Sequence, residues 1–279
     1  MSRARRAFER AAATYDSADA LHREVGRRLV EHLDPIRIDP ARVLDLGCGT
    51  GSQLEELARR FPRSELVGVD FSRSMLRRAA ARAPWWKRAV GARTPRFACA
   101  DLQALPLAAS SAALAFSNLA LQWCDATAVF TEAARVLEKD GLLLFSTLGP
   151  DTLRELRAAF GTAPFAGLVD MHDLGDALVA AGFGQPVMEM ELLTLEYSTL
   201  EGLLADLHAV GALAAAASPS ASLAARERRN AAARAYESLR REGVLPATYE
   251  VVYGHAWKTG ARHAADGRQV IDFVRAPKP

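Results

Sequence analysis

The chain has 279 residues, is 50% hydrophobic and carries a formal net charge of +2. A chain of this length buries roughly 75% of its unfolded surface, so we expect a single domain, 1–279, whose core needs no disulfides. The small net charge gives no indication of a nucleic-acid partner. The three cysteines form no C-x-x-C pair, which fits a reducing compartment.

Histidine spacing and apolar runs argue against two further kinds of function. The six histidines are scattered without metal-ligand spacing, so the sequence predicts no metal site. No run of about 18 apolar residues is present to cross a membrane, and we expect a cytoplasmic protein without a membrane partner. The arginine-rich start would also fit an organelle presequence, although Glu9, Asp16 and Asp19 interrupt it.

The first 34 residues carry amphipathic helical patterns and the stretch "TYD" at 14–16. They precede the alternating strands and helices that follow. We therefore expect 1–34 to form a helical lid segment that becomes ordered over a bound ligand.

The core opens with "VLDLGCGTG", residues 43–51. We expect a strand that ends at Asp45 and then a tight turn, because glycine occupies every second position at Gly47, Gly49 and Gly51. Such a turn lets a ligand approach the backbone. Its spacing differs from the G-x-G-x-x-G dinucleotide fingerprint and from the P-loop, so a nucleotide phosphate is not the favoured ligand.

Strand and helix patterns alternate from this motif to residue 149. The expected helices are 52–61, 72–83 with Ser72 as N-cap, and 126–137, which "EKDG" closes; the expected strands are 65–70, 96–101, 112–118 and 142–149. This alternation predicts an α/β fold with a doubly wound, mostly parallel sheet. Ligands of such sheets bind at the carboxyl ends of the strands.

Polar residues fall at or just past four of these strand ends and should line one crevice; they are Asp45, Asp70, Asp101 and Asn118. An acidic residue at position 70 is placed to accept ribose hydroxyls. Asp101 could accept the exocyclic amine of adenine, and Met75 could contact its ring, with core packing as an equal alternative for Met75. These residues fit a nucleoside without phosphate better than they fit NAD.

The C-terminal part has a different pattern. Alternating strands at 187–197 and 248–257 predict an antiparallel end to the sheet, and the alanine-rich stretch between them, 198–245, predicts a helical lid insert over the acceptor site. The connection "RAPWWKRAVGARTPRF" is longer than a minimal one and would fit either a partner surface or a folded crossing. Of the two, we expect the folded crossing, with Trp85 and Trp86 buried.

Five segments resemble, in order and spacing, the motifs of class I S-adenosylmethionine-dependent methyltransferases; they are "VLDLGCGTG", "LVGVD", "CADLQALPL", "SNLALQW" and "VLEKDGLLLFST". The resemblance implies a Rossmann-like, seven-stranded fold with 41–148 as its cofactor-binding core. It also implies S-adenosyl-L-methionine as the cofactor.

A narrower resemblance covers nearly the whole chain. "AAATYD", "FSNLALQWC", "FSTLGPDTLRELRAAF", "VDMHDLGDALVAAGF" and "LPATYEVVYGHAW" are similar to segments of the malonyl-[acyl-carrier protein] O-methyltransferases of biotin synthesis. This similarity implies methylation of the free carboxylate of a malonyl thioester on acyl-carrier protein. Because that carboxylate is already ionised, the reaction needs neither a strong base nor a metal, and alignment in a closed site would supply the catalysis.

The same resemblance implies roles for individual residues. Those expected to hold the cofactor are Asp45, Gly47 and Gly49 at the methionine part, Asp70 at the ribose, Asp101 and Leu102 at the adenine, and Asn118 and Leu119 beside the sulfonium. Gly51 of the glycine turn and Met75 complete the expected cofactor site. Those expected at the reaction itself are Tyr15, closing over the methyl group, and Asn118, Gln122 and Trp123 near the acceptor. Core packing explains Tyr15 and Trp123 equally well.

Two other functions stay open at this point. An arginine hydroxylase of a respiratory-complex subunit, or an assembly factor, would share the fold and segments similar to "SNLALQW" and "LPATYEVVYGHAWK". A nucleic-acid methyltransferase ranks third, because Ser117, Asn118, Leu119 and Ala120 stand where D/N-P-P-Y is usual.

The expected partner is an acyl-carrier protein bearing malonyl, with malonyl-coenzyme A as an alternative, and we expect a monomer. Arginine clusters, including Arg228 and Arg229 in the helical insert, could create a positive field for an acidic carrier, or could be a solvated face. A further cation is expected to face the malonyl carboxylate, and the sequence does not single it out.

Overall fold

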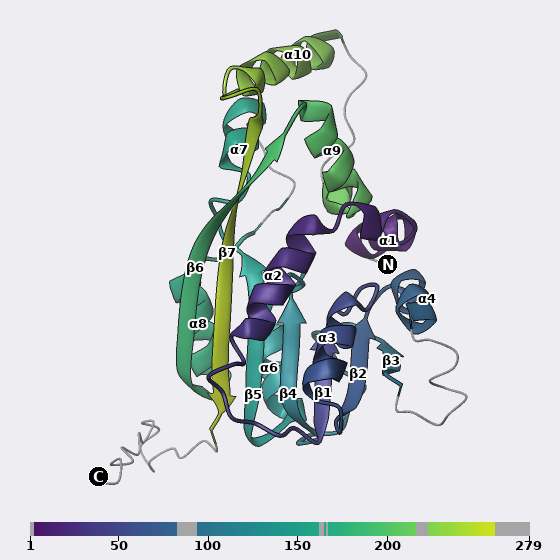
Figure 1. Ribbon diagram of the computed structural model, residues 1–279. Coiled ribbons are helices and arrows are strands. Elements are labelled where there is room, and N and C mark those ends of the chain that lie inside the picture. The colour runs from purple at the N-terminus through teal and green to yellow at the C-terminus, as the bar shows by residue number, and fades with distance from the viewer. Residues whose placement is uncertain (1–2, 83–93, 162–164, 166, 216–222, 260–279) are drawn as a thin grey trace.

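The structure is a computed structural model, and the residues that it describes are 3–82, 94–161, 165, 167–215 and 223–259. Seven strands of the described chain form one sheet in the order β3-β2-β1-β4-β5-β7-β6 (Figure 1). The strands are β1 Arg42–Leu46, β2 Glu65–Asp70, β3 Arg96–Cys99, β4 Ala112–Asn118, β5 Leu137–Leu148, β6 Phe183–Tyr197 and β7 Leu245–Lys258. The expected α/β fold with a seven-stranded sheet is confirmed.

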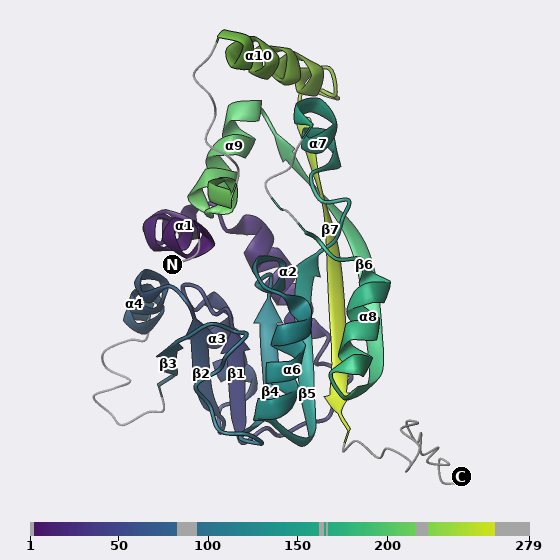
Figure 2. The same ribbon diagram turned by 180° about the vertical axis from the view of Figure 1, so that it is seen from behind.

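The strands β1 to β5 run parallel, as their apolar runs predict. All of β1 after Arg42 and all of β2 after Glu65 is buried, because helices cover both faces of the sheet. On one face lie α2 Ala20–Glu31 and α3 Ser52–Arg60; on the other lie α6 Ala126–Val136 and α8 Met171–Ala180 (Figures 1 and 2). The sheet is therefore doubly wound.

One strand begins earlier than the sequence indicates. We expected "EKDG" at 138–141 to close the helix before it, but β5 starts at Leu137 and includes these residues. Pairing with β4 shifts register between Ala112 and Leu114, and Asp140 has a φ of 61°. The segment is thus an exposed irregularity within a strand, and its charged residues concealed the strand pattern.

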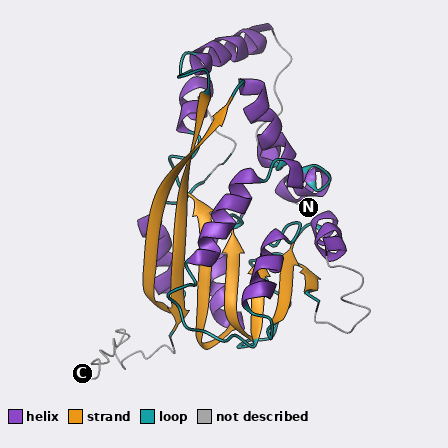
Figure 3. Ribbon diagram, viewed as in Figure 1, coloured by secondary structure: helices purple, strands orange, loops and turns teal. Residues whose placement is uncertain are grey.

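The two last strands form the expected antiparallel end, since β7 pairs antiparallel with both β5 and β6. They have 15 residues in β6 and 14 in β7, and they extend well beyond the parallel strands (Figure 3). Around their far end lie α7 Arg154–Phe160, α9 Leu200–Ala209 and α10 Leu223–Glu237. Residues 216–222, and Trp85 with Trp86, lie outside the described residues.

The N-terminal helices lie over the carboxyl ends of the parallel strands. α1 Arg3–Ala11 packs beside α4 Arg73–Arg82 and beside the short η3 Ala212–Ala215, and η1 Tyr15–Ser17 leads from α1 into α2 (Figure 1). Ser72 accepts a hydrogen bond from the backbone N–H of Met75 at 3.2 Å, as expected of an N-cap. None of the described helices is both long enough and apolar enough to span a bilayer.

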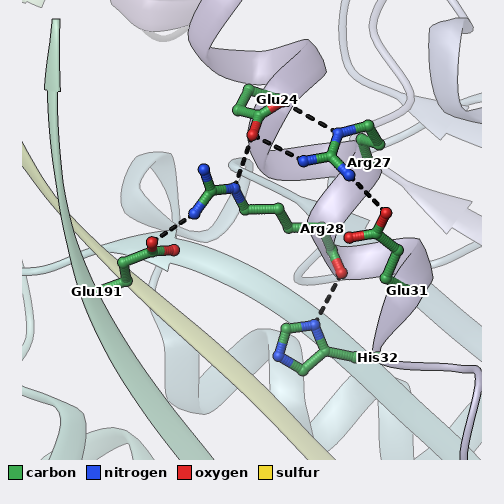
Figure 4. A network of polar contacts seen from close by, with 6 residues as sticks. All are labelled: Glu24, Arg27, Arg28, Glu31, His32 and Glu191. Atoms are coloured by element: carbon green, nitrogen blue, oxygen red, sulfur yellow. Dashed lines mark hydrogen bonds and ion pairs between the residues drawn. The ribbon is translucent and has the colours of Figure 1, made fainter.

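Polar contacts hold α2 against β6. The Arg28 guanidinium donates to Glu24 of its own helix at 2.7 Å and to Glu191 of β6 (Figure 4). His32, which follows α2, donates from Nδ1 to the Arg28 carbonyl at 2.8 Å and stacks on Tyr253 at 4.9 Å between ring centroids. Such half-exposed pairs stabilise a fold by about 1 kcal/mol or less each. Their shared effect is to fix the direction in which α2 crosses the sheet.

Candidate cofactor and acceptor sites

The carboxyl ends of the parallel strands open into a cavity beneath α1, which we call the cofactor cavity. Ten of the thirteen predicted site residues line it: Tyr15, Gly47, Gly49, Asp70, Met75, Asp101, Leu102, Asn118, Leu119 and Trp123. They come from η1, from α4 and from the loops after β1 to β4. These residues are far apart in the chain, and the rule that ligands bind at strand carboxyl ends correctly predicts that they lie together.

The glycine turn keeps the backbone close to this cavity. Gly47 and Gly49 have φ values of 81° and 51°, which residues with a Cβ rarely adopt. A Cβ on Gly47 would lie 2.3 Å from Cβ of Ala120, whereas a Cβ on Gly49 would meet no atom within 4 Å. Gly47 is thus required by packing, and Gly49 by backbone conformation beside open space that a ligand can fill.

Asp70 ends β2 and faces the cavity. Its carboxylate accepts hydrogen bonds from the backbone N–H groups of Gly49, at 3.0 Å, and Ser72, at 2.7 Å. Burial raises the pKa of Asp70 to about 6, although both hydrogen bonds favour the ionised form. At neutral pH the residue is therefore mainly a carboxylate, the form that accepts hydroxyl groups.

Two of the residues expected to hold the cofactor, Asp45 and Gly51, do not line the cavity. Asp45 is buried one residue before the end of β1, and its Oδ2 has no hydrogen-bond partner among the described residues. Burial, and then the charge of Asp70, raise the pKa of Asp45 to about 8. Gly51 precedes α3 with a φ of 83°, and a Cβ there would lie 2.9 Å from Cβ of Ala79. Gly51 thus lets α3 approach α4.

The residues expected to bind adenine differ in the contacts that they already make within the protein. Asp101 is exposed, and its Oδ1 accepts from the backbone and side chain of Gln103 at 3.0 and 3.1 Å. Leu102 is buried, and Met75 is fully buried and packs with Phe8 while also lining the cavity. Core packing and cavity lining, the two readings of Met75, are therefore compatible.

Asn118 joins three elements at the end of β4. Its Nδ2 donates to the carbonyl of His22 in α2 at 2.8 Å, and its Oδ1 accepts from Ser146 of β5 at 2.8 Å. The next residue, Leu119, has a φ of 47°, a strained value for a leucine. Asn118 thus ties α2 to the sheet beside the cavity, a role that its place at a strand end did not reveal.

The N-terminal segment roofs the cofactor cavity with aromatic rings. Phe8 makes an edge contact with Trp123, 5.2 Å between centroids, and Tyr15 lies 6.4 Å from Phe8. Burial raises the pKa of Tyr15 above its ordinary value, so its hydroxyl stays protonated. Sequence reasoning missed Phe8 and Phe71. The available signal for Phe8 was its seven-residue spacing from Tyr15, which in a continuous helix would put both near one face, although α1 ends at Ala11 and Tyr15 begins η1.

Polar contacts fasten this roof to the core. Glu9 accepts from the first two N–H groups of α4, those of Arg73 and Ser74, at 2.8 and 3.0 Å. Asp16 accepts from Thr50 at 2.6 Å and pairs with Arg82 at 2.8 Å. A carboxylate at a helix N-terminus is favoured by the helix dipole, so α1 is anchored on α4.

A second cavity, which we call the acceptor cavity, lies between α2, α9 and the ends of β5, β6 and β7. Gln122 lines it, and Leu119 and Trp123 line both cavities. Most of its surface is apolar, and its polar members are His22, Gln122, Tyr197, Asp206 and Tyr249, with the indole of Trp123. No arginine or lysine is among the described residues that line either cavity. The cation expected for the malonyl carboxylate is therefore not found in these linings.

Among the described residues, no group of three or more His, Cys, Asp or Glu side chains could hold a metal ion. Leu119 and Trp123 line both cavities, so a ligand in one cavity would lie beside a ligand in the other. This is the geometry that a group transfer requires.

Comparisons with known proteins agree with this geometry. Residues 44–145 match a family model described as a methyltransferase domain. Among solved structures, the YcgJ protein of Bacillus subtilis aligns with a TM-score of 0.57 at 17% identity, over 84% of this chain and 98% of that one. Phosphoethanolamine N-methyltransferase 2 of Haemonchus contortus, in complex with S-adenosyl-L-methionine, aligns with a TM-score of 0.56 at 18% identity, over 90% of this chain and 57% of that one. These likenesses show the fold.

Curated relatives show the family. Malonyl-[acyl-carrier protein] O-methyltransferase of Gallionella capsiferriformans is 48% identical over 96% of this chain and 94% of its own length. The protein of the same name from Methylovorus is 46% identical over 98% of this chain and 94% of its own length. Since these similarities include the N-terminal helices, the cofactor core and the insert together, the chain belongs to the malonyl-[acyl-carrier protein] O-methyltransferase family.

Proposed function

We propose that the chain transfers the methyl group of S-adenosylmethionine to the free carboxylate of a malonyl thioester on acyl-carrier protein. The methyl ester hides a charge, so that fatty-acid enzymes can extend the chain towards the pimeloyl unit of biotin. The observation that carries this proposal is the pair of cavities that meet at Leu119 and Trp123. A cytoplasmic, monomeric enzyme that prefers the carrier protein to coenzyme A is part of the same proposal.

When bound, S-adenosylmethionine supplies an electrophilic methyl group, whose bond to sulfur breaks with its electron pair left on sulfur while a carboxylate oxygen forms the new bond. No proton moves. Asp70 would accept the ribose hydroxyls, Asp101 and Leu102 would hold the adenine, and the glycine turn would leave room for the methionine part. The ionised state of Asp70 and the open space beside Gly49 support these assignments.

The acceptor side works by alignment and by exclusion of water. Tyr15 would close over the methyl group, and Leu119 and Trp123 line both cavities. Residues 1–34 act as the lid, 41–148 as the cofactor core, and 198–245 as the insert over the acceptor. Fixed geometry of this kind can contribute several kcal/mol to the rate, roughly 7–11 kcal/mol in favourable cases.

The test is to incubate the purified protein with methyl-labelled S-adenosylmethionine and malonyl-acyl-carrier protein, and to follow label into a base-labile methyl ester. Acetyl-acyl-carrier protein, which has no free carboxylate, is the matched control and should take up no label. A protein that binds S-adenosylmethionine yet labels neither carrier would contradict the proposal. In that case arginine hydroxylation and nucleic-acid methylation would be assayed next.

A further inference from the structure

The acceptor cavity must bind an anion without a positive side chain in its described lining. It contains the carboxylate of Asp206, and no arginine or lysine is among the described residues that line it. A buried carboxylate ligand needs hydrogen-bond donors, because an unpartnered charge inside a protein is strongly unfavourable. Among the described lining residues, the available donors are therefore uncharged groups.

Most polar side chains of this wall are already engaged within the protein. The hydroxyl of Tyr197 interacts with Asp206 and with the hydroxyl of Tyr249. The side-chain amide of Gln122 donates to the carbonyl of Leu119 at 2.7 Å and lies 3.5 Å from the hydroxyl of Thr147. These groups hold the wall together and leave few donors for a ligand.

His22 is different. Neither of its ring nitrogens hydrogen-bonds a described residue, and Nδ1 is shielded from solvent without a partner. Its backbone is fixed, because its carbonyl accepts from Asn118, and its ring lies 5.3 Å from the ring of Tyr15. Burial lowers the pKa of His22 to about 4, so the free protein presents a neutral imidazole with one N–H donor.

The two ends of the acceptor cavity therefore differ. His22 contacts Tyr15 and Asn118, and both of these also line the cofactor cavity. Asp206 instead contacts Tyr197, and neither residue lines the cofactor cavity. An incoming carboxylate is repelled at the Asp206 end and finds a free donor at the His22 end, which is the end next to the cofactor.

We propose that the imidazole of His22 donates a hydrogen bond to the acceptor carboxylate and so turns the malonyl group with its free acid towards the cofactor cavity. This inference rests on the proposed function, of which it names the acceptor-binding residue. His22 acts on the carboxylate oxygen that does not attack, and the other oxygen stays free to react. The thioester then points towards Asp206 and Tyr197.

The test compares His22→Phe, which keeps a ring and removes the donor, with His22→Gln, which keeps an amide N–H. His255→Phe is the matched control, since His255 is a half-buried histidine of β7 outside both cavities. We expect His22→Phe to raise KM for malonyl-acyl-carrier protein by roughly tenfold to a hundredfold, the loss of one hydrogen bond to a charged group. His22→Gln should recover part of this loss, and His255→Phe should match the wild type.

Binding of acetyl-acyl-carrier protein, measured by calorimetry in the presence of S-adenosylhomocysteine, separates a carboxylate contact from a general defect. His22→Phe should bind the acetyl form like the wild type and lose the wild-type preference for the malonyl form. Equal weakening of both forms, or no weakening of either, overturns the inference. So does a selective loss in Trp123→Phe with His22→Phe unchanged, which would assign the carboxylate to the indole N–H. If the wild type prefers malonyl but transfers no methyl, the proposed function fails while the binding result stands.

Discussion

The cofactor cavity and the acceptor cavity share a wall at Leu119 and Trp123, yet they are built in different ways. The cofactor cavity consists mainly of short loops at the ends of parallel strands, where backbone conformation restricts the residue type, as at Gly47 and Gly49. The acceptor cavity is assembled from α2, α9 and the extended ends of β6 and β7, mostly by apolar side chains. The first depends on local geometry, and the second on how distant segments pack.

This difference makes the cofactor cavity the more sensitive of the two to single substitutions in its backbone. Replacing Gly47 by alanine should have the largest effect, because the new Cβ would overlap Ala120 at a φ of 81°. Overpacking and a left-handed backbone together should weaken S-adenosylmethionine binding by about 2–5 kcal/mol. Gly243→Ala is the matched control, since Gly243 has a φ of 85° and no neighbour within 4 Å. Equal cofactor affinity in both variants, measured by calorimetry, would refute the prediction.

Asp70→Asn should have the second largest effect on cofactor affinity. The change keeps the shape of the side chain but removes the charge that would bind the ribose, so cofactor affinity should fall by about 1.5–3 kcal/mol. Asp125→Asn is the control, because Asp125 likewise accepts backbone N–H groups, at 2.9 and 3.4 Å, as the N-cap of α6, but does not itself line either cavity. Unchanged affinity in folded Asp70→Asn would remove this residue from the ribose site.

Tyr15→Ala tests the roof that the two cavities share. Because Tyr15 contacts His22 of the acceptor wall while lining the cofactor cavity, turnover should fall by about 1–2 kcal/mol of activation free energy, with a smaller change in cofactor affinity. Tyr15→Phe keeps the ring and should lose less. Full activity after deletion of residues 1–20 would rule out a lid role for this segment.

The buried acid beneath the glycine turn makes stability depend on pH. The pKa of Asp45 rises from an ordinary 3.8 to about 8 in the folded chain. The contribution of its protonated carboxyl to the free energy of unfolding is therefore complete below about pH 4, and it is lost as the pH rises from there through 8. Asp45→Asn removes this titration. Between pH 5 and pH 9 the melting temperature of the wild type should therefore fall more than that of the variant. The extra fall should be roughly 2–4 °C for each kcal/mol by which the titration of Asp45 lowers the free energy of unfolding. If the melting temperatures of the wild type and of Asp45→Asn change by the same amount between these pH values, Asp45 does not titrate in this range.

The smallest effect should come from the outer surface beyond the acceptor cavity. Reversing Arg228 and Arg229 of α10 to glutamate should raise KM for malonyl-acyl-carrier protein by roughly twofold to tenfold and leave KM for malonyl-coenzyme A nearly unchanged, because steering by charge acts on a protein partner. Reversing Arg73 and Arg77 of α4 gives the same change of charge on another face. A loss in the second pair alone would locate docking on α4 instead of α10.

The difference between the cofactor cavity and the acceptor cavity also explains how much of each could be predicted from the sequence alone. The sheet, its antiparallel end and the cluster of strand-end residues followed from apolar periodicity and from the rule for strand carboxyl ends. The bridging amide of Asn118 and the free ring of His22 did not, because both depend on where α2 crosses the sheet, which contacts such as Arg28 with Glu191 determine. A periodicity says that a helix has a buried face, but it does not say which strand that face meets.

The roof described above has a consequence for the order of events in a catalytic cycle. One continuous stretch, residues 8–22, lines both cavities. It supplies Phe8 and Tyr15 to the cofactor cavity, and Ala18, Ala20, Leu21 and His22 to the acceptor cavity. Exchange of the cofactor beneath this stretch must displace it, and that displacement takes away one wall of the acceptor cavity. We therefore expect an ordered sequence, in which the nucleoside enters before the thioester and leaves after the ester, so that product inhibition by S-adenosylhomocysteine is competitive towards S-adenosylmethionine alone.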